Sequence, residues 1–272
     1  MGQLTTAKRV MKDGGLNGIL AAVKDRYFTN RLGSKIDWFY GRAVEICGNT
    51  VEIDGCTFSL SSPVISTSSK GKFMFDRYER PERKALHEFL DPLLPVIELG
   101  GSIGVVSCLT NRKLAHPENH VVVEANPSLV PLLIANRDRN GCKFSVLPRV
   151  VGYGADHVTF YADNNNFVVS STVQADRTEH VEAHNIPTIN LETILQEKGF
   201  DKCTLICDIE GGESDVLSYE ADVLRNRVAT LILEVHEWSL GKPRVEEMFK
   251  ELAELGFKTV AVDQDTYTFQ KG

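Results

Sequence analysis

Short apolar segments alternate with helix-like segments through most of this chain, and this alternation constrains the fold more than any other feature. Five segments have the length and apolar character of buried strands: 96–99, 120–124, 144–151, 204–207 and 230–235. Segments with the helical spacing of apolar residues lie between them, at 105–114, 129–139, 191–198 and 214–224. Because parallel strands need a long crossover connection, this order predicts an α/β fold in which helices cover both faces of a parallel sheet.

The end of the chain adds two strands with a different connection. A helix is predicted at 245–255, and strands follow at 258–262 and 266–269. Because only a short turn separates these two strands, they should pair antiparallel. The prediction is therefore a seven-stranded, mostly parallel sheet with an antiparallel last strand. A separate hairpin is predicted from 158–161 and 168–173.

The first part of the chain has a different character. Residues 1–40 have a helical pattern, and the apolar residues between 16 and 23 share one face of that helix. Apolar and polar residues then alternate over 44–60, and Asp54-Gly55 interrupts the run. This pattern predicts a β-hairpin.

A serine-rich loop at 61–71 separates this part from the main domain, and a helix opened by a proline is predicted at 81–90. We therefore predict an N-terminal helical and hairpin extension at 1–74 and a main domain at 75–272. The apolar helix face favours a homo-oligomer that forms through the extension.

Composition disfavours several classes of function. The formal net charge is -7 and the 30 Lys and Arg residues form no basic run, so nucleic acid is not an expected partner. The apolar runs are far shorter than the roughly 20 residues of a membrane helix, and the first residues lack the apolar run of a secretory signal, so no membrane partner is expected. The six cysteines include no CxxC pair, which disfavours a zinc cage and fits a reducing, cytoplasmic location.

The first strand of the predicted sheet runs into a glycine-rich turn. Gly100, Gly101 and Gly104 surround Ser102 there, and a predicted helix follows. Glycines let the backbone turn sharply and approach a ligand, and the free N–H groups of a helix N-terminus attract an anionic group. The turn does not match the dinucleotide fingerprint G-x-G-x-x-G, because serine and valine stand at its second and third glycine positions. A tight turn without a ligand is the alternative interpretation.

Two acids near this turn favour an adenosine-containing ligand. Glu98 precedes Gly100 by two residues, a poor place for an acid beside a pyrophosphate but a good one beside the cationic amino-acid part of S-adenosylmethionine. Glu124 ends the next strand, 24 residues after Gly100, where an acid can accept hydrogen bonds from a ribose diol. Val151, at the end of the third strand, would then flank the adenine.

The fourth and fifth strands deliver acids and a histidine to the same edge of the sheet. Asp208, Glu210 and Glu213 follow the fourth strand, and Glu234 and His236 end the fifth. Clustered acids raise one another's proton affinity, so one of them, or the histidine, is a candidate general base for a hydroxyl. These residues have the ligand types for a divalent cation, but the sequence fixes no geometry and no metal is assigned. Alternatively, Glu213 opens the next helix and His236 is structural.

Four segments together resemble the FkbM-type methyltransferases: ELGGSIG at 98–104, VVVEANP at 121–127, CDIEGGE at 207–213 and LEVHE at 233–237. Tyr78-Glu79 also resembles the approach to the cofactor loop in that family. The similarity spans about residues 75 to 262. The family usually begins this loop with Asp and continues Gly-Ala-Asn, whereas Glu98 and Gly-Gly-Ser stand here.

The resemblance implies a Rossmann-like class I fold with S-adenosylmethionine as cofactor and S-adenosylhomocysteine as product. Together with the residue patterns, it gives as cofactor residues Tyr78, Glu98, Gly100, Gly101, Ser102, Gly104, Glu124, Ala125, Val151 and Asp208. It gives as residues of the reaction pocket Asp208, Glu210, Glu213, Glu234 and His236.

The expected activity is transfer of a methyl group to a hydroxyl of a sugar or small metabolite, by in-line displacement. Whether a divalent metal is required stays open. Two alternatives remain. One is a non-catalytic binding or scaffold protein that keeps the fold, since fold does not fix activity. The other is a nicotinamide-dependent oxidoreductase, against which the failed fingerprint argues.

Overall fold

The computed structural model describes residues 31–75, 77–163 and 181–272. The chain divides into two compact units, one from residues 1–49 with 67–77 and the other from 50–66 with 78–272. The predicted hairpin therefore groups with the second unit. The apolar face predicted between residues 16 and 23 lies outside the described residues, and both the oligomer it favoured and the boundary at residue 74 stay predictions.

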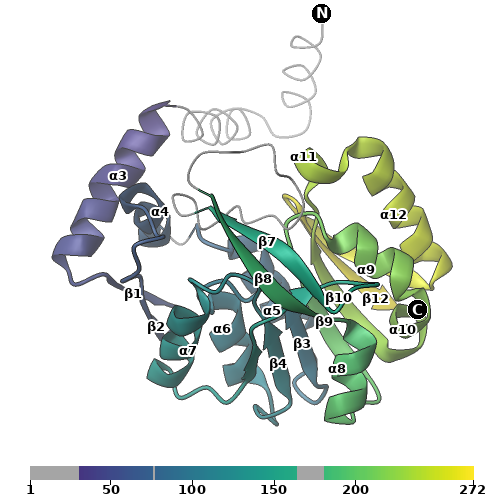
Figure 1. Ribbon diagram of the computed structural model, residues 1–272. Helices are drawn as coiled ribbons and strands as arrows, with labels where there is room; N and C mark the ends of the chain where they lie inside the picture. Colours follow the sequence, from purple (N-terminus) through teal and green to yellow (C-terminus); the bar gives the residue numbers. More distant parts are fainter. Residues whose placement is uncertain (1–30, 76, 164–180) are drawn as a thin grey trace, which may run out of the picture. The chain divides into compact units, whose positions relative to one another are not determined.

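A seven-stranded sheet runs through the second unit (Figure 1). In spatial order its strands are β11 (Phe257–Asp263), β12 (Thr266–Lys271), β10 (Val228–Glu234), β9 (Cys203–Cys207), β3 (Val96–Leu99), β4 (His120–Val123) and β5 (Ser145–Leu147). Neighbours pair parallel except that β12 lies antiparallel to both β10 and β11. The predicted seven-stranded, mostly parallel sheet with an antiparallel last strand is confirmed. The strand order reverses between β3 and β9, which is where open α/β sheets bind ligands.

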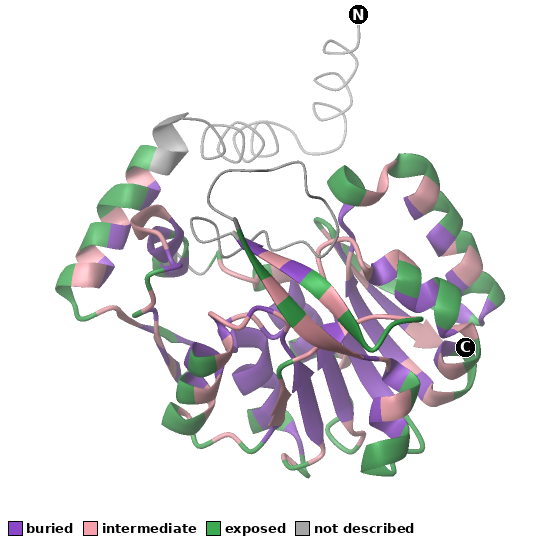
Figure 2. Cartoon of the chain, viewed as in Figure 1, coloured by how far each residue is buried: buried purple, intermediate pink, exposed green. Residues whose placement is uncertain are grey.

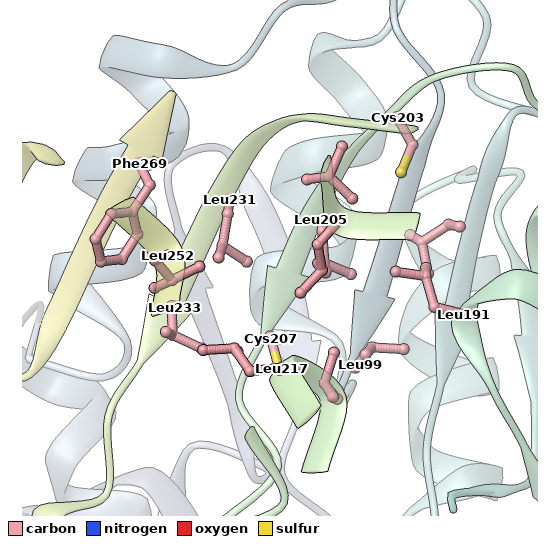
Figure 3. Close-up of a cluster of buried hydrophobic side chains, with 14 of the residues drawn as sticks. Leu99, Leu191, Cys203, Leu205, Cys207, Leu217, Leu231, Leu233, Leu252 and Phe269 are labelled. Atoms are coloured by element: carbon pink, nitrogen blue, oxygen red, sulfur yellow. The ribbon is translucent and has the colours of Figure 1, made fainter. Parts of the chain in front are cut away.

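Helices cover both faces of this sheet, as predicted. One face carries α8 (Leu191–Lys198), α9 (Glu213–Tyr219), α10 (Ala221–Arg227) and α12 (Lys242–Glu254). Figure 3 shows the core on this side, where Leu99, Leu205 and Leu233 from the strands lie with Leu217 and Leu252 from the helices. The other face packs on α5 (Arg80–Phe89) and α6 (Val105–Lys113). Alternate residues of a strand point to opposite faces of the sheet. Because helices cover both faces here, β3 and β4 are buried along their whole length (Figure 2).

The predicted third strand, 144–151, is two strands in two sheets. β5 (Ser145–Leu147) joins the main sheet, while β6 (Val150–Val151) pairs with β8 (Val181–Ile189) in a three-stranded sheet. Pro148 lies between them, and since proline has no N–H to donate, the ladder breaks there.

The hairpin predicted from 158–161 and 168–173 has a different partner strand. Its first arm is confirmed as β7 (His157–Asp163), which pairs antiparallel with β8. Residues 168–173 lie outside the described residues. The prediction missed β8, in which His184 stands opposite Phe160.

The predicted helix 214–224 is broken at Glu220, between α9 and α10. The Glu220 carboxylate is buried and accepts hydrogen bonds from Leu191 N at 2.6 Å, Glu192 N at 2.8 Å and the Tyr153 hydroxyl at 2.8 Å. Two of these donors are N–H groups at the start of α8 that have no partner within their own helix. Glu220 thus caps α8, and the helix predicted at 214–224 is interrupted at this residue.

The hairpin at the start of the second unit is formed by β1 (Thr50–Ile53) and β2 (Cys56–Ser59). Its turn residues Asp54 and Gly55 both have positive φ, as a two-residue hairpin turn requires. The prediction is therefore right about the turn. It is wrong about residues 44–46, which end a helix rather than begin a strand.

The first unit, taken alone, contains α3 (Arg31–Ile46), α4 (Thr67–Lys72) and the 3-10 turn η1 (Phe73–Phe75). Residues 67–71, predicted as part of a loop, thus belong to a helix. The two helices lie so close together that a Cβ on Gly41 would overlap the Thr67 carbonyl, so only glycine fits there. Glu45 of α3 accepts from Thr67 at 2.8 Å and from Lys70 at 3.1 Å. Among the described parts of the chain, no helix has the length and apolar character needed to cross a membrane.

Candidate functional site

The glycine-rich turn between β3 and α6 is shaped by positive φ angles at Gly100 (94°), Ser102 (47°) and Gly104 (89°). A Cβ on Gly100 would overlap the carbonyl oxygen of Asp208, the residue that follows β9. A Cβ on Gly104 would lie 2.7 Å from the Leu133 side chain. Only glycine allows these approaches. The close contact at Gly100 brings the turn and the end of β9 to one place at the edge of the sheet.

Glu124 holds the turn from the neighbouring strand. Its Oε2 accepts from Ser102 N at 2.6 Å and its Oε1 from Asn126 N at 2.7 Å. The side chain is buried, and burial raises its pKa to about 7, although the hydrogen bonds from the backbone lower it. Ala125 packs against the cluster of Val150, Phe160 and Ala162, and Val151 follows in β6, half-buried. The structure thus brings Glu124 to the turn, as the sequence predicted.

Tyr78 reaches the same turn from the residues before α5. Its hydroxyl lies 3.1 Å from Ser102 Oγ, and burial raises its pKa well above the ordinary value. Glu79 has positive φ (49°), and its Oε2 is buried without a hydrogen-bond partner among the residues that the structure describes. Burial and nearby Glu82 raise the pKa of Glu79 well above its usual range. Neither Glu79 nor Glu82 was predicted as a site residue, because both look like acids that open a helix.

Glu98 is placed away from the turn. It is fully buried in β3, where its Oε1 accepts from Ser107 Oγ at 2.7 Å and its Oε2 lies 3.2 Å from His120 Nε2. The structure therefore does not group Glu98 with the other candidate cofactor residues. Contact of Glu98 with the cofactor stays a prediction, and the pairing of both its oxygens with Ser107 and His120 does not favour it.

The five predicted pocket residues lie together at the ends of β9 and β10. We call them the carboxylate–histidine group: Asp208, Glu210, Glu213, Glu234 and His236. His236 lies at its centre, with Nδ1 2.8 Å from Glu213 Oε1. Its Nε2 lies 3.3 Å from Glu210 Oε2, 3.6 Å from Asp208 Oδ1 and 4.0 Å from Glu234 Oε1.

The sequence profile of the methyltransferase FkbM domain matches residues 98–259, which is more than half of the chain and includes both the turn and the carboxylate–histidine group. The chain belongs to the FkbM methyltransferase family. S-adenosylmethionine-dependent methyl transfer is therefore its class of activity, and the nicotinamide oxidoreductase alternative has no support. No curated protein sequence matches the chain.

Several solved methyltransferases resemble this FkbM-family chain weakly. A putative O-methyltransferase from Klebsiella pneumoniae is 12% identical with a TM-score of 0.41, over 72% of this chain and 81% of that one. M. jannaschii TYW2 in complex with AdoMet is 12% identical with a TM-score of 0.41, over 82% and 86%. Aeropyrum pernix fibrillarin, with natively bound S-adenosyl-L-methionine, is 10% identical with a TM-score of 0.39, over 69% and 71%. Such low scores carry no argument about the substrate.

Charges within the carboxylate–histidine group of this FkbM protein perturb one another strongly. Burial, and then nearby Glu234 and Glu210, raise the pKa of Asp208 well above its usual range. Burial also raises the pKa of Glu210 to about 7, although the charge of His236 lowers it. Burial lowers the pKa of His236, but the hydrogen bond and charge of Glu213 and the other carboxylates outweigh it and bring it to about 9. When His236 is protonated, its imidazolium partly neutralises the charge of the neighbouring acids.

Proposed function

We propose that this FkbM-family protein binds S-adenosylmethionine at the glycine-rich turn and transfers its methyl group to a hydroxyl oxygen of a sugar or small metabolite. The observation that carries the proposal is the contact of Gly100 with the Asp208 backbone. This contact brings the glycine-rich turn directly beside a group of side chains that can accept a proton.

The cofactor's chemistry fits the turn in three places. The N-terminus of α6, which has nine residues and follows Gly104, offers backbone N–H groups to the methionine carboxylate. Glu124 accepts backbone hydrogen bonds from Gly101, Ser102 and Asn126, and since a carboxylate has about four lone-pair sites, acceptor capacity is left for the ribose diol. Tyr78 and Ser102 add two hydroxyls. Gly101, Ala125 and Val151 complete the proposed cofactor residues, with the last two near the adenine.

The reaction needs one bond to form as another breaks. The hydroxyl oxygen attacks the methyl carbon, the carbon–sulfur bond breaks, and neutral S-adenosylhomocysteine leaves. The hydroxyl proton passes to the carboxylate–histidine group, since an alcohol is a poor nucleophile while protonated. Holding oxygen, carbon and sulfur in line contributes up to about 7–11 kcal/mol.

The first experiment is calorimetric titration of the full chain with S-adenosylmethionine and S-adenosylhomocysteine. We expect micromolar binding that Glu124→Ala weakens and that Glu246→Ala, an exposed acid on α12, leaves unchanged. Absence of binding by a folded sample would reject the proposal and favour the scaffold alternative. Radiolabelled methyl transfer to a panel of sugars, other alcohols and amines then tests the acceptor. Transfer to amines alone would contradict O-methylation.

His236 supplies a second test of the reaction pocket. We expect His236→Ala to lower kcat much more than it weakens S-adenosylmethionine binding, because the side chain lies with the acids beyond the turn. An equal loss of cofactor affinity would contradict this role.

A cytoplasmic location also belongs to this proposal. All six cysteines are free thiols, which fits a reducing compartment. Fractionation of the native source would test the location directly.

A further inference from the structure

Three side chains of the carboxylate–histidine group converge on one point from two strands. Asp208 follows β9, Glu234 ends β10, and His236 comes two residues later. One ligand atom from each lies within 4.8 Å of the others. Two ligands bound at about 2.0–2.2 Å to one ion lie at most about 4.4 Å apart. The 3.6 Å and 4.0 Å separations of His236 Nε2 from the two carboxylates therefore suit a shared ion.

The orientation of His236 is fixed by Glu213. This carboxylate is fully buried, and besides His236 Nδ1 it accepts from Ile209 N and Gly211 N, each at 3.2 Å. Metal-binding histidines commonly donate a hydrogen bond from one ring N–H to a carboxylate in this way, which directs the other nitrogen at the ion. A positioning carboxylate is thus already in place behind the candidate ligand.

One of the oxygens that face this point lacks a hydrogen bond. Asp208 Oδ1 is buried and has no hydrogen-bond partner among the described residues. The His236 side chain is 7% exposed, and its Nε2 lies 3.3 Å to 4.0 Å from oxygens of three carboxylates. Buried polar atoms are nearly always satisfied in proteins, so an unpaired oxygen beside this ring nitrogen indicates a missing partner.

We propose that Asp208, Glu234 and His236 bind a divalent first-row metal ion, with Glu210 as a nearby fourth carboxylate and Glu213 as the positioning residue. The donor set is two carboxylates and an imidazole, which suits ions such as Mn²⁺ or Co²⁺ better than Mg²⁺, an ion that prefers oxygen alone. A cation also balances the charge of the crowded acids.

If the proposed function holds, an ion at this position would activate the hydroxyl that receives the methyl group. The site lies beside the turn proposed to bind the cofactor, where the acceptor hydroxyl must approach. A bound divalent ion lowers the pKa of a hydroxyl that it coordinates. The expected acceptors are therefore molecules whose hydroxyl can coordinate a metal ion.

Binding of Co²⁺ to the full chain, freed of metal by a chelator, tests the site without cofactor or acceptor. We expect one Co²⁺ per chain by calorimetry, with a visible absorption band from its new ligands. Asp208→Asn and Glu234→Gln should each raise the Kd at least tenfold, and Glu213→Gln by about 10–100-fold. Glu246→Gln is the matched control and should bind as the wild type does. Wild-type affinity in both ligand variants would overturn the proposal.

A fluorescence measurement keeps the test decisive even if a ligand variant fails to fold. The chain has two tryptophans, so Trp38→Phe leaves Trp238 alone, with its ring centroid 6.0 Å from that of His236. Co²⁺ quenches nearby tryptophan, so we expect saturable quenching with the same midpoint as the calorimetry. Binding without quenching would place the ion elsewhere. A chain that binds S-adenosylmethionine but no Co²⁺ would overturn the metal site and leave the proposed function intact, and the reverse result would reject only the function.

Discussion

The affinity for S-adenosylmethionine should depend on pH through Glu124, and Glu124→Gln should remove that dependence. In the structure this carboxyl group is buried beside the glycine-rich turn, and its pKa is raised from 4.5 to about 7. If it accepts hydrogen bonds from the ribose diol, the ionised form is the one that binds. Binding below neutral pH must then release a proton.

The size of the effect follows from the pKa. With a pKa of about 7, roughly a tenth of the carboxyl is ionised at pH 6 and roughly nine tenths at pH 8. The Kd of the wild type should therefore fall about tenfold between these pH values, which corresponds to about 1.4 kcal/mol. Glu124→Gln should bind more weakly at pH 8, because an amide nitrogen then faces a backbone N–H.

Calorimetric titrations at pH 6 and pH 8, in two buffers of different ionisation enthalpy, give both the Kd ratio and the number of protons released. The ligand's own amino group titrates equally in both proteins, so the ratio of wild type to Glu124→Gln isolates the carboxyl. An unchanged Kd in the wild type, or the same pH dependence in the variant, would refute the reasoning.

The raised pKa of Glu124 also makes the free energy of unfolding depend on pH. Whereas cofactor affinity should rise with pH, the stability of the ligand-free fold should fall. A raised pKa means that the folded state favours the protonated carboxyl, so its stabilising contribution is complete below about pH 4.5 and is lost as the pH rises through about 7. Relative to Glu124→Gln, the ligand-free wild type should lose on the order of 3 kcal/mol across this window. Urea unfolding at several pH values measures the difference.

Two further predictions concern stability, with urea unfolding as the assay. Gly100→Ala should destabilise the fold by at least about 3 kcal/mol, because the new Cβ would overlap the Asp208 carbonyl at a φ of 94°. The control Gly141→Ala also has positive φ, but its Cβ would meet open space, so it should cost only about 1 kcal/mol. Equal losses of stability in the two variants would contradict the overlap at Gly100. Glu220→Ala leaves three donors without their acceptor and should cost about 3–5 kcal/mol, against about 1 kcal/mol for Tyr153→Phe, which loses one hydrogen bond. A small loss for Glu220→Ala would show that solvent replaces the carboxylate.

Local patterns in the sequence were enough to predict the strands of the seven-stranded sheet and most helices of the second unit. The apolar runs of β3, β4, β9 and β10 are buried on both faces, and only a sheet covered on both sides allows that. The same patterns failed where a distant residue decides the outcome. Glu220 breaks a helix because it serves donors on α8 and Tyr153, and the sequence around it shows no sign of that.

The candidate site also has features that the sequence predicts and features that only the packing decides. Parallel strands end at a common edge, so the sequence by itself determined that Glu124, Asp208, Glu234 and His236 would gather near the glycine-rich turn. Only the tertiary structure decided which atoms face one another: Glu98 turns away to Ser107 and His120, while His236 is held by Glu213 and directs Nε2 at the acids. Strand order places residues to within a few ångströms, whereas ligand geometry depends on side-chain packing between elements that are distant in the chain.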